Sequence, residues 1–212
     1  MAIVAPELTQ SCPPSVTAAS GIDALVHAVE SYISNFASDI TRALSVGAIK
    51  MIVNALPDAY RRPDDLDARE RMATGSLMAG LAFGNAGVGA VHALAYPLGG
   101  RYHLSHGVSN ALMFTHVMRW NLSSCPNDFL NIALAMGAEA TISEADAGDF
   151  VIEKLESLCR AVEIPGGLRE FGIERSDLRS IAEAASGVTR LLRNNPRELS
   201  VDDIEAIYQA AY

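Results

Sequence analysis

Apolar residues recur at helical spacing along most of the chain. Steps of three and four residues place one apolar stripe on a segment that begins near residue 16, formed by Ile22, Leu25, Val26, Val29 and Ile33. We therefore predict a first helix there. The opening run Ile3-Val4-Ala5-Pro6 has strand character, but no other strand-like alternation follows it, so we expect a short strand whose pairing partners lie outside this sequence.

Start and stop signals predict the helices of the middle of the chain. A second helix is expected from Asp39 to Leu56, ended by Pro57, because proline disfavours helix continuation. A third is expected from Asp64 or Asp65 to about Phe83, with acidic residues in its first turn.

Glycine and proline interrupt the pattern that follows. A short helix is expected from about Val88 to Tyr96, stopping at Pro97-Leu98-Gly99-Gly100. The next is predicted to begin near His106 and to end near Trp120.

The C-terminal third carries three helix starts and two stops. Starts are predicted at Ser143, Ser176 and Ser200, and stops at Gly137 and Gly187. The linkers are short and no repeat is visible, so the sequence predicts one all-helical domain of eight or nine helices.

Composition narrows the possible partners. The chain has 212 residues and is half apolar, yet no uncharged apolar run approaches the ~20 residues that a membrane span needs. The net charge of −9 opposes binding to nucleic acid. Three scattered cysteines and the lack of a basic N-terminal signal region favour reduced thiols and a cytoplasmic location.

Histidine and aspartate residues gather in two short segments. Asp23 and His27 lie four apart, so they share one face of the first helix. His92, His103 and His106 fall within one glycine-rich segment, and a helix that begins at His106 favours the neutral imidazole there. Carboxylate and imidazole are ligands for Fe(II) or Zn(II).

Two simpler interpretations remain open at this point. Asp23 and His27 are also a common surface pair, and His92, between apolar neighbours, is also typical of a core histidine bonded to the backbone. A helical bundle without metal is therefore an alternative.

Two longer motifs resemble one family. Gly21-Ile-Asp-Ala-Leu-Val-His-Ala-Val-Glu-Ser-Tyr32 is similar to the first signature of the iron-containing (group III) alcohol dehydrogenases, and residues 87–107, from Gly87-Val-Gly-Ala-Val-His to Leu-Ser-His-Gly107, are similar to the second. Residues 82–86 and 194–204 also resemble the family. The resemblance covers essentially the whole chain and points to its C-terminal helical metal-binding domain, which has the dehydroquinate synthase-like fold.

The resemblance implies a metal, Fe(II) or Zn(II), held by Asp23, His27, His92 and His106. It also implies an NAD- or NADP-dependent alcohol dehydrogenase in which the metal polarises an alcohol or carbonyl oxygen for hydride transfer. Phe83 falls where the family has an aromatic residue near the substrate and cofactor. His103 matches no ligand position and is expected at the edge of the site or in a structural role.

Two departures from the family pattern affect the mechanism. Four residues after His92 many members carry a histidine proposed to relay protons, whereas this chain has Tyr96, a hydrogen-bond donor but a poor base at neutral pH. The family's nucleotide-binding domain has no counterpart in the sequence either, and the spacing of Gly84, Gly87 and Gly89 does not form its phosphate loop.

The resemblance also suggests how the chain is divided. Residues 1–15 are expected to be a strand and linker remaining from an N-terminal Rossmann-like domain, and residues 16–212 the all-helical metal-binding domain. We expect a homo-oligomer acting on a small alcohol or aldehyde, with little activity from this chain alone. The alternatives are a hydroxyacid-oxoacid transhydrogenase, a Zn(II) polyol dehydrogenase, or a non-enzymatic metal-binding helical module.

Overall fold

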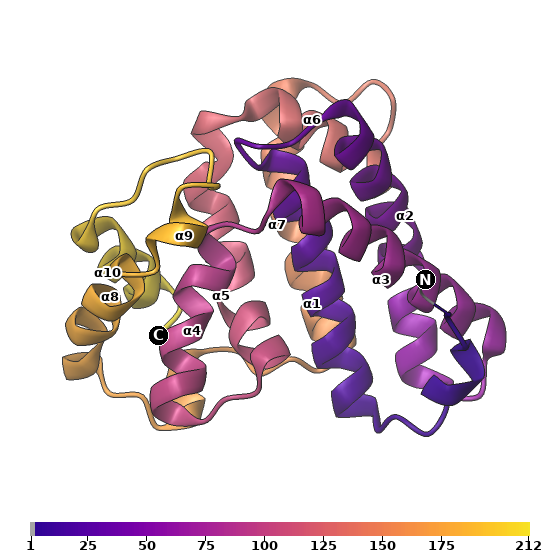
Figure 1. Ribbon diagram of the computed structural model, residues 1–212, viewed down its shortest axis with the longest axis horizontal. Helices are drawn as coiled ribbons and strands as arrows, with labels where there is room; N and C mark the ends of the chain where they lie inside the picture. The colour runs from indigo at the N-terminus through magenta and orange to yellow at the C-terminus, as the bar shows by residue number, and fades with distance from the viewer. Residues whose placement is uncertain (1–2) are drawn as a thin grey trace.

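The computed structural model describes residues 3–212, and within that range it contains helices and loops but no strand (Figure 1). The all-helical fold expected from the sequence is confirmed. The α-helices are α1 (Pro14–Ile33), α2 (Asp39–Arg61), α3 (Leu66–Ala86), α4 (Ala90–Tyr102), α5 (His106–Asn121), α6 (Pro126–Ala135), α7 (Glu144–Ala161), α8 (Leu178–Ser186), α9 (Thr189–Leu192) and α10 (Val201–Ala210). The short 3-10 helices are η1 (Pro6–Thr9), η2 (Leu122–Ser124), η3 (Leu168–Phe171) and η4 (Arg175–Asp177).

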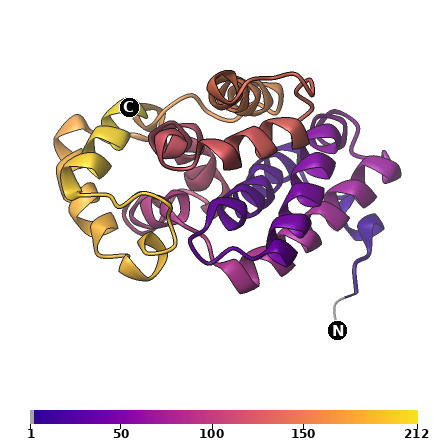
Figure 2. The same ribbon diagram turned by 90° about the horizontal axis from the view of Figure 1, so that it is seen from above.

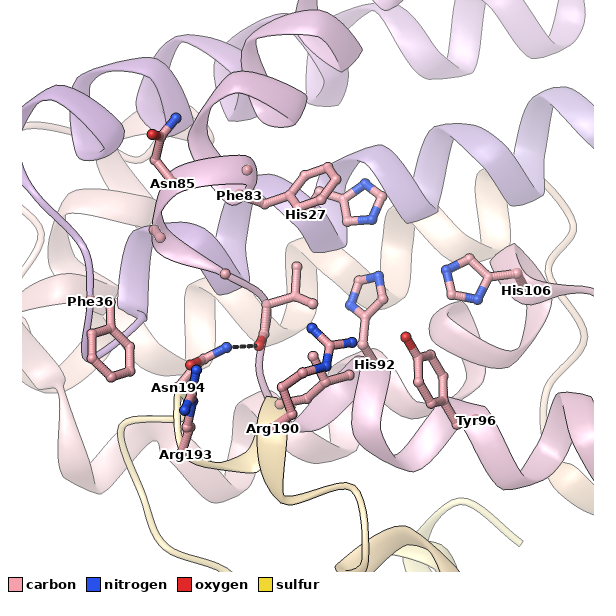
Figure 3. A pocket seen from close by; sticks show the side chains of 15 residues that line it. His27, Phe36, Phe83, Asn85, His92, Tyr96, His106, Arg190, Arg193 and Asn194 are labelled. Carbon is pink, nitrogen blue, oxygen red and sulfur yellow. Dashed lines mark hydrogen bonds between the residues drawn. The ribbon is translucent and has the colours of Figure 1, made fainter.

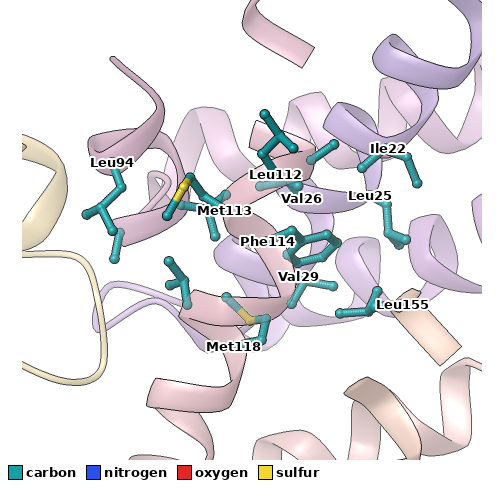
Figure 4. Close-up of a cluster of buried hydrophobic side chains, with 14 of the residues drawn as sticks. Ile22, Leu25, Val26, Val29, Leu94, Leu112, Met113, Phe114, Met118 and Leu155 are labelled. Atoms are coloured by element: carbon teal, nitrogen blue, oxygen red, sulfur yellow. The ribbon is translucent and has the colours of Figure 1, made fainter. Parts of the chain in front are cut away.

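Helix α1 lies at the centre of the molecule. It packs against α2 and α3 on one side and against α5 on the other, and its predicted apolar stripe is buried. Figure 4 shows Phe114 and Met118 of α5 beside Leu25 and Val29 of α1, with Leu155 of α7 closing the cluster. Burial of this large apolar area is the main force that fixes α1 against its neighbours.

The C-terminal helices form the far end of the molecule. In both views α8, α9 and α10 lie opposite α2 and α3, with α4 and α5 between them (Figures 1 and 2). Helix α8 packs against α4 and α10, and α9 packs against α4. The chain therefore returns at its end to cover the helix that carries His92.

Local signals predicted most helix starts correctly. The side chains of Asp65, Ser143 and Ser200 cap α3, α7 and α10 by accepting a hydrogen bond from the backbone three residues later. Helix α5 begins at His106 and ends at Asn121, one residue from its predicted end. Gly137 and Gly187 follow α6 and α8, as expected for helix stops.

Two predicted helix ends were wrong, both at proline. Helix α2 passes through Pro57 to Arg61, and α4 passes through Pro97 to Tyr102. A proline removes one backbone donor, and each one is followed within two residues by a fully buried side chain, Ala59 in α2 and Leu98 in α4. Tertiary packing of the last turns therefore outweighs the local preference.

The predicted strand at residues 3–6 is not formed. Residues 3–5 have no regular structure, and Pro6 begins η1, with the amide of Leu8 donating to the carbonyl of Ala5 at 3.1 Å. A strand needs hydrogen bonds from a neighbouring strand, and none is present in residues 3–212. The proposed boundary at residue 15 stays a prediction. Residues 1 and 2 of the predicted N-terminal segment lie outside the described range.

Among the described residues no single helix is long and apolar enough to cross a membrane. In the same range, only α3 and α4 taken together are long and apolar enough to do so, and the two helices are bent by 101° relative to each other.

Candidate metal centre

Helix α1 presents three polar side chains on one buried face. Asp23, His27 and Glu30 are spaced by four and three residues, so their side chains line up along successive turns. Glu30 is only 2 % exposed. A buried carboxylate requires hydrogen-bonding partners, which directs attention to what lies against this face.

Helices α4 and α5 supply the partners. His92 lies in the first turn of α4, and His106 is the first residue of α5. At Gly107 the backbones of α5 and α1 approach so closely that a Cβ atom there would come within 2.5 Å of the Ala19 carbonyl oxygen. The glycine therefore allows His106 to lie directly over the Asp23 face of α1.

The four residues predicted as ligands lie together. One ligand atom from each of Asp23, His27, His92 and His106 can be chosen so that all lie within 4.8 Å of one another. The Nε2 atoms of His92 and His106 are each 3.7 Å from Asp23 Oδ1. The rings of His27 and His92 are stacked with centroids 4.7 Å apart, and Figure 3 shows three imidazoles around one space.

Glu30 fixes the orientation of His92. One of its carboxylate oxygens accepts a hydrogen bond from the Val91 amide at 2.6 Å, and the other lies 2.6 Å from His92 Nδ1. An ionised carboxylate only accepts, so the hydrogen-bond network assigns the proton to Nδ1. The Nε2 atom is then unprotonated, and its lone pair is directed toward the cluster.

This arrangement fits a divalent metal ion. Nε2 of His92 is buried and has no hydrogen-bond partner among the described residues, although buried nitrogen atoms normally have one. Ligand atoms held at ~2.0–2.2 Å from a tetrahedral ion lie roughly 3.3–3.6 Å apart, close to the 3.7 Å separations observed. Three imidazoles with one carboxylate suit Fe(II) or Zn(II).

Burial also keeps His27 in the form that binds metal. Desolvation lowers its pKa to about 4, although the carboxylate of Asp23 acts in the opposite direction. The ring is therefore neutral at physiological pH, and a neutral imidazole has the free lone pair that a metal requires.

Asn110 supports the two remaining residues of the cluster. Its amide nitrogen donates to Asp23 Oδ1 at 2.5 Å and lies 3.1 Å from His106 Nε2. Asn110 follows His106 by one turn of α5 and is fully buried. Its contacts hold the carboxylate from α1 beside the imidazole from α5.

A cavity of about 670 Å³ opens beside the cluster, within the ~300–1,000 Å³ range of small-molecule sites. Phe83 lines it, with its ring stacked on His27 at 4.3 Å, and so does the half-exposed Tyr96. His103 does not line this cavity and is not part of the four-residue cluster. It ends α4 in a left-handed conformation, with φ of 57°.

Sequence reasoning missed Glu30, Asn110 and two arginines of the cavity wall, Arg190 and Arg193. Glu30 continues the spacing of Asp23 and His27 on α1, and Asn110 follows His106 at the same four-residue step. Both spacings were visible in the sequence. The arginines follow α8 by only a few residues but lie far along the chain from the histidines, so nothing local connected them to the site.

Comparisons with known proteins agree with this all-helical fold. Residues 17–212 match the sequence pattern of the C-terminal part of the Fe-containing alcohol dehydrogenase family. Long-chain-alcohol dehydrogenase 1 of Geobacillus thermodenitrificans is 47 % identical over the whole of this chain and 54 % of its own length. The chain therefore belongs to the Fe-containing alcohol dehydrogenase family and corresponds to its C-terminal domain.

Solved structures show the same relationship. A 1,3-propanediol oxidoreductase superposes with a TM-score of 0.95 at 41 % identity, covering 98 % of this chain and 54 % of the other. The sulfoacetaldehyde reductase of Bifidobacterium kashiwanohense, solved with NAD+, gives 0.88 at 26 % identity, covering 97 % and 52 %. The chain thus spans about half the length of the proteins it matches.

Proposed function

We propose that this chain is the metal-binding half of an NAD- or NADP-dependent alcohol dehydrogenase that acts on a small alcohol or aldehyde. The observation that carries the proposal is the convergence of four side chains near Nε2 of His92, which has no hydrogen-bond partner within residues 3–212. Asp23, His27, His92 and His106 are the ligands in this proposal, and Fe(II) or Zn(II) is the ion.

The metal would supply Lewis-acid polarisation of the alcohol or carbonyl oxygen. The residues of the chain would orient the reactants and exclude water. Glu30 holds His92 with its lone pair toward the cluster, and Asn110 holds Asp23 beside His106. Both contacts keep the ligand atoms in place before metal and substrate arrive, which lowers the reorganisation that binding requires.

Phe83 and Tyr96 complete the proposed site. Phe83 presents an aromatic wall of the cavity next to His27, suited to stack on the flat ring of a nicotinamide. Tyr96 lines the same cavity, with its ring 6.5 Å from that of His106. Its hydroxyl group is proposed to donate a hydrogen bond to the substrate oxygen, in place of a histidine relay.

Hydride transfer also needs a bound dinucleotide. Gly84 lies inside α3, whereas Gly87, which ends that helix with φ of 76°, and Gly89, which precedes α4, belong to the turn between the two helices. A dinucleotide-binding loop instead connects a strand to a helix. We therefore expect this 212-residue chain to bind metal but, on its own, to reduce NAD with alcohols very slowly. Rapid alcohol-dependent NAD reduction by the isolated chain would contradict this.

Metal analysis tests the proposed site. After loading with Zn(II) or Fe(II) and removal of excess metal, wild-type chain is expected to retain about one ion per chain, as four converging ligands imply. The double variant His27→Ala/His92→Ala should retain almost none. A matched control, His103→Ala/His116→Ala, removes two histidines outside the cluster and should load like wild type. Equal, negligible metal in all three proteins would refute the proposal.

A further inference from the structure

The wall of the cavity opposite α1 carries two arginines. Arg190 lies in α9 and Arg193 directly after it, and both line the cavity that contains His27, His92 and His106. The cavity lining includes no aspartate or glutamate. The carboxylate of Asp23 lies 3.7 Å from His92 and from His106, so the negative charge lies behind the histidines. In a chain with a net charge of −9, the cavity wall that carries the two arginines is therefore locally positive.

The guanidinium group of Arg190 has no protein partner in the described part of the chain. Its side chain forms neither a hydrogen bond nor an ion pair there, whereas Arg179, on α8, pairs with Glu183, Asp202 and Glu205. Figure 3 shows Arg190 pointing into the cavity, toward the side where His92 lies. A forked cationic donor in that position is suited to bind a carboxylate.

The segment that carries these arginines is held firmly. Leu191 between them is buried, and the Asn194 side chain donates to the Val88 carbonyl at 2.8 Å, across the cavity floor (Figure 3). Asn35 donates to the carbonyl of Arg193 at 3.2 Å, and the Arg193 guanidinium lies 5.9 Å from the centre of the Phe36 ring. The positive wall is thus anchored to the same α3–α4 turn that leads into His92.

We propose that Arg190, assisted by Arg193, binds an acidic group at the far end of the substrate, so that the substrate is a short hydroxy acid or oxo acid. This inference rests on the proposed function, because the alcohol or carbonyl end of such a molecule would lie at the four-residue cluster. Arg190 then selects an acid over a neutral alcohol of the same length through a charge-assisted hydrogen bond.

The test measures binding rather than turnover. Dissociation constants for 4-hydroxybutanoate and its neutral analogue 4-hydroxybutanamide are measured by calorimetry on the Zn(II)-loaded chain. The acid is expected to bind about 10-fold or more tightly than the amide, since one charge-assisted bond contributes on that order. Arg190→Ala should remove the preference, and Arg190→Lys, which keeps the charge but not the fork, should retain part of it.

Arg61→Ala is the matched control, because it removes one exposed arginine far from the cavity. Phe36, which lines the cavity, lies just before the start of α2, and Arg61 lies at the other end of that helix, which is roughly 33 Å long. It should leave both dissociation constants unchanged. Equal binding of acid and amide by wild type, or a preference that survives in Arg190→Ala, overturns the inference.

A second arm separates a substrate acid from the phosphates of a dinucleotide. ADP is titrated into wild type and Arg190→Ala. One outcome is that ADP displaces the acid from wild type and that Arg190→Ala weakens ADP binding as much as it weakens acid binding. In that case the positive wall binds phosphates of the cofactor, and the substrate assignment is wrong. If the chain takes up no zinc, the proposed function fails, whereas an Arg190-dependent preference for the acid in the metal-free chain still supports the anion site.

Discussion

The Glu30–His92 pair determines which nitrogen of His92 faces the cluster. Glu30 is buried, accepts from the Val91 amide with one oxygen, and contacts His92 Nδ1 with the other. Carboxylates in this position orient a metal-binding imidazole and raise its basicity. In the proposed metal centre, Glu30 is thus a positioning residue rather than a ligand.

The variant Glu30→Gln tests this role. A glutamine oxygen still accepts from Val91, but its NH₂ group would then face His92 Nδ1 and favour the tautomer protonated at Nε2, which cannot bind metal. We expect zinc affinity to fall about 10- to 100-fold with the fold retained. Chelator competition measures the affinity, and circular dichroism checks the fold. Glu156→Gln, on the surface of α7, is the control, and an unchanged affinity in Glu30→Gln would contradict the assigned role.

Two cysteines give a pH prediction at the same scale. Burial raises the pKa of Cys125 and of Cys159 to about 12, from an ordinary value near 9. We expect both thiols to stay unlabelled by a thiolate-specific reagent at pH 9 in the folded chain and to react once it is denatured, because the thiolate is the reactive form. Mass spectrometry of the labelled peptides measures this.

The sign of the linked stability effect follows from the same values. Between pH 9 and pH 12 the unfolded chain has lost these thiol protons while the folded chain keeps them, so stability falls as the pH rises through that window. Labelling of either thiol at pH 9 at the rate of a free thiol would contradict the raised pKa values.

At the residue scale, the resemblance of two motifs to the family predicted the four-residue cluster, but the spacings of Glu30 and Asn110 alone did not show that these residues support it. Asp23 and His27 share a helix face, and the second motif contains His92 and His106. Glu30 on the same face is equally consistent with a solvated glutamate. Its burial depends on how α4 packs over α1, which local spacing does not encode.

At the scale of elements, the site depends on how closely α5 approaches α1. Gly107 lies at the contact, and a Cβ atom there would come within 2.5 Å of the Ala19 carbonyl oxygen and 3.1 Å of the Ala19 Cβ atom. Backbone atoms cannot move aside as a flexible side chain can. A side chain at 107 must therefore push the start of α5, and His106 with it, away from Asp23.

Substitution of Gly107 is expected to affect both stability and metal binding. Gly107→Ala should destabilise the chain by about 1–3 kcal/mol, as overpacking does, and should weaken zinc binding as His106 shifts. Gly100→Ala is the matched control on α4, where no atom lies within 4 Å of the added Cβ. It should stabilise the chain by about 0.5–1 kcal/mol and leave zinc affinity unchanged. Urea unfolding with zinc titration measures both, and identical behaviour of the two variants would exclude the close contact.

Helix starts were more predictable than helix ends for a physical reason. A start depends on one side chain reaching its own backbone, as Ser143 and Ser200 do, and that chemistry is local. The ends of α2 and α4 depend on whether later turns find a surface to pack on. Ala59 and Leu98 are buried against neighbouring elements, so α2 and α4 continue past Pro57 and Pro97.

At the scale of the whole molecule, helix α1 and the consecutive helices α4 and α5, which lie more than 50 residues further along the chain, place polar side chains around one space. Helix α1 contributes two of the proposed ligands, and α4 and α5 one each. The all-helical fold and the family followed from the sequence because long motifs span both segments. The positive cavity wall could not be predicted from the sequence, because the segment around Arg190 contacts α4 only through tertiary packing.

X-ray absorption at the zinc edge tests the central claim most directly, because it reports the ligands of the ion itself. For the Zn(II)-loaded chain we predict one zinc per chain with nitrogen and oxygen neighbours at about 2.0–2.1 Å, and outer-shell scattering from three imidazoles. A zinc ion without imidazole scattering, or with sulfur neighbours, would contradict a centre formed by Asp23, His27, His92 and His106.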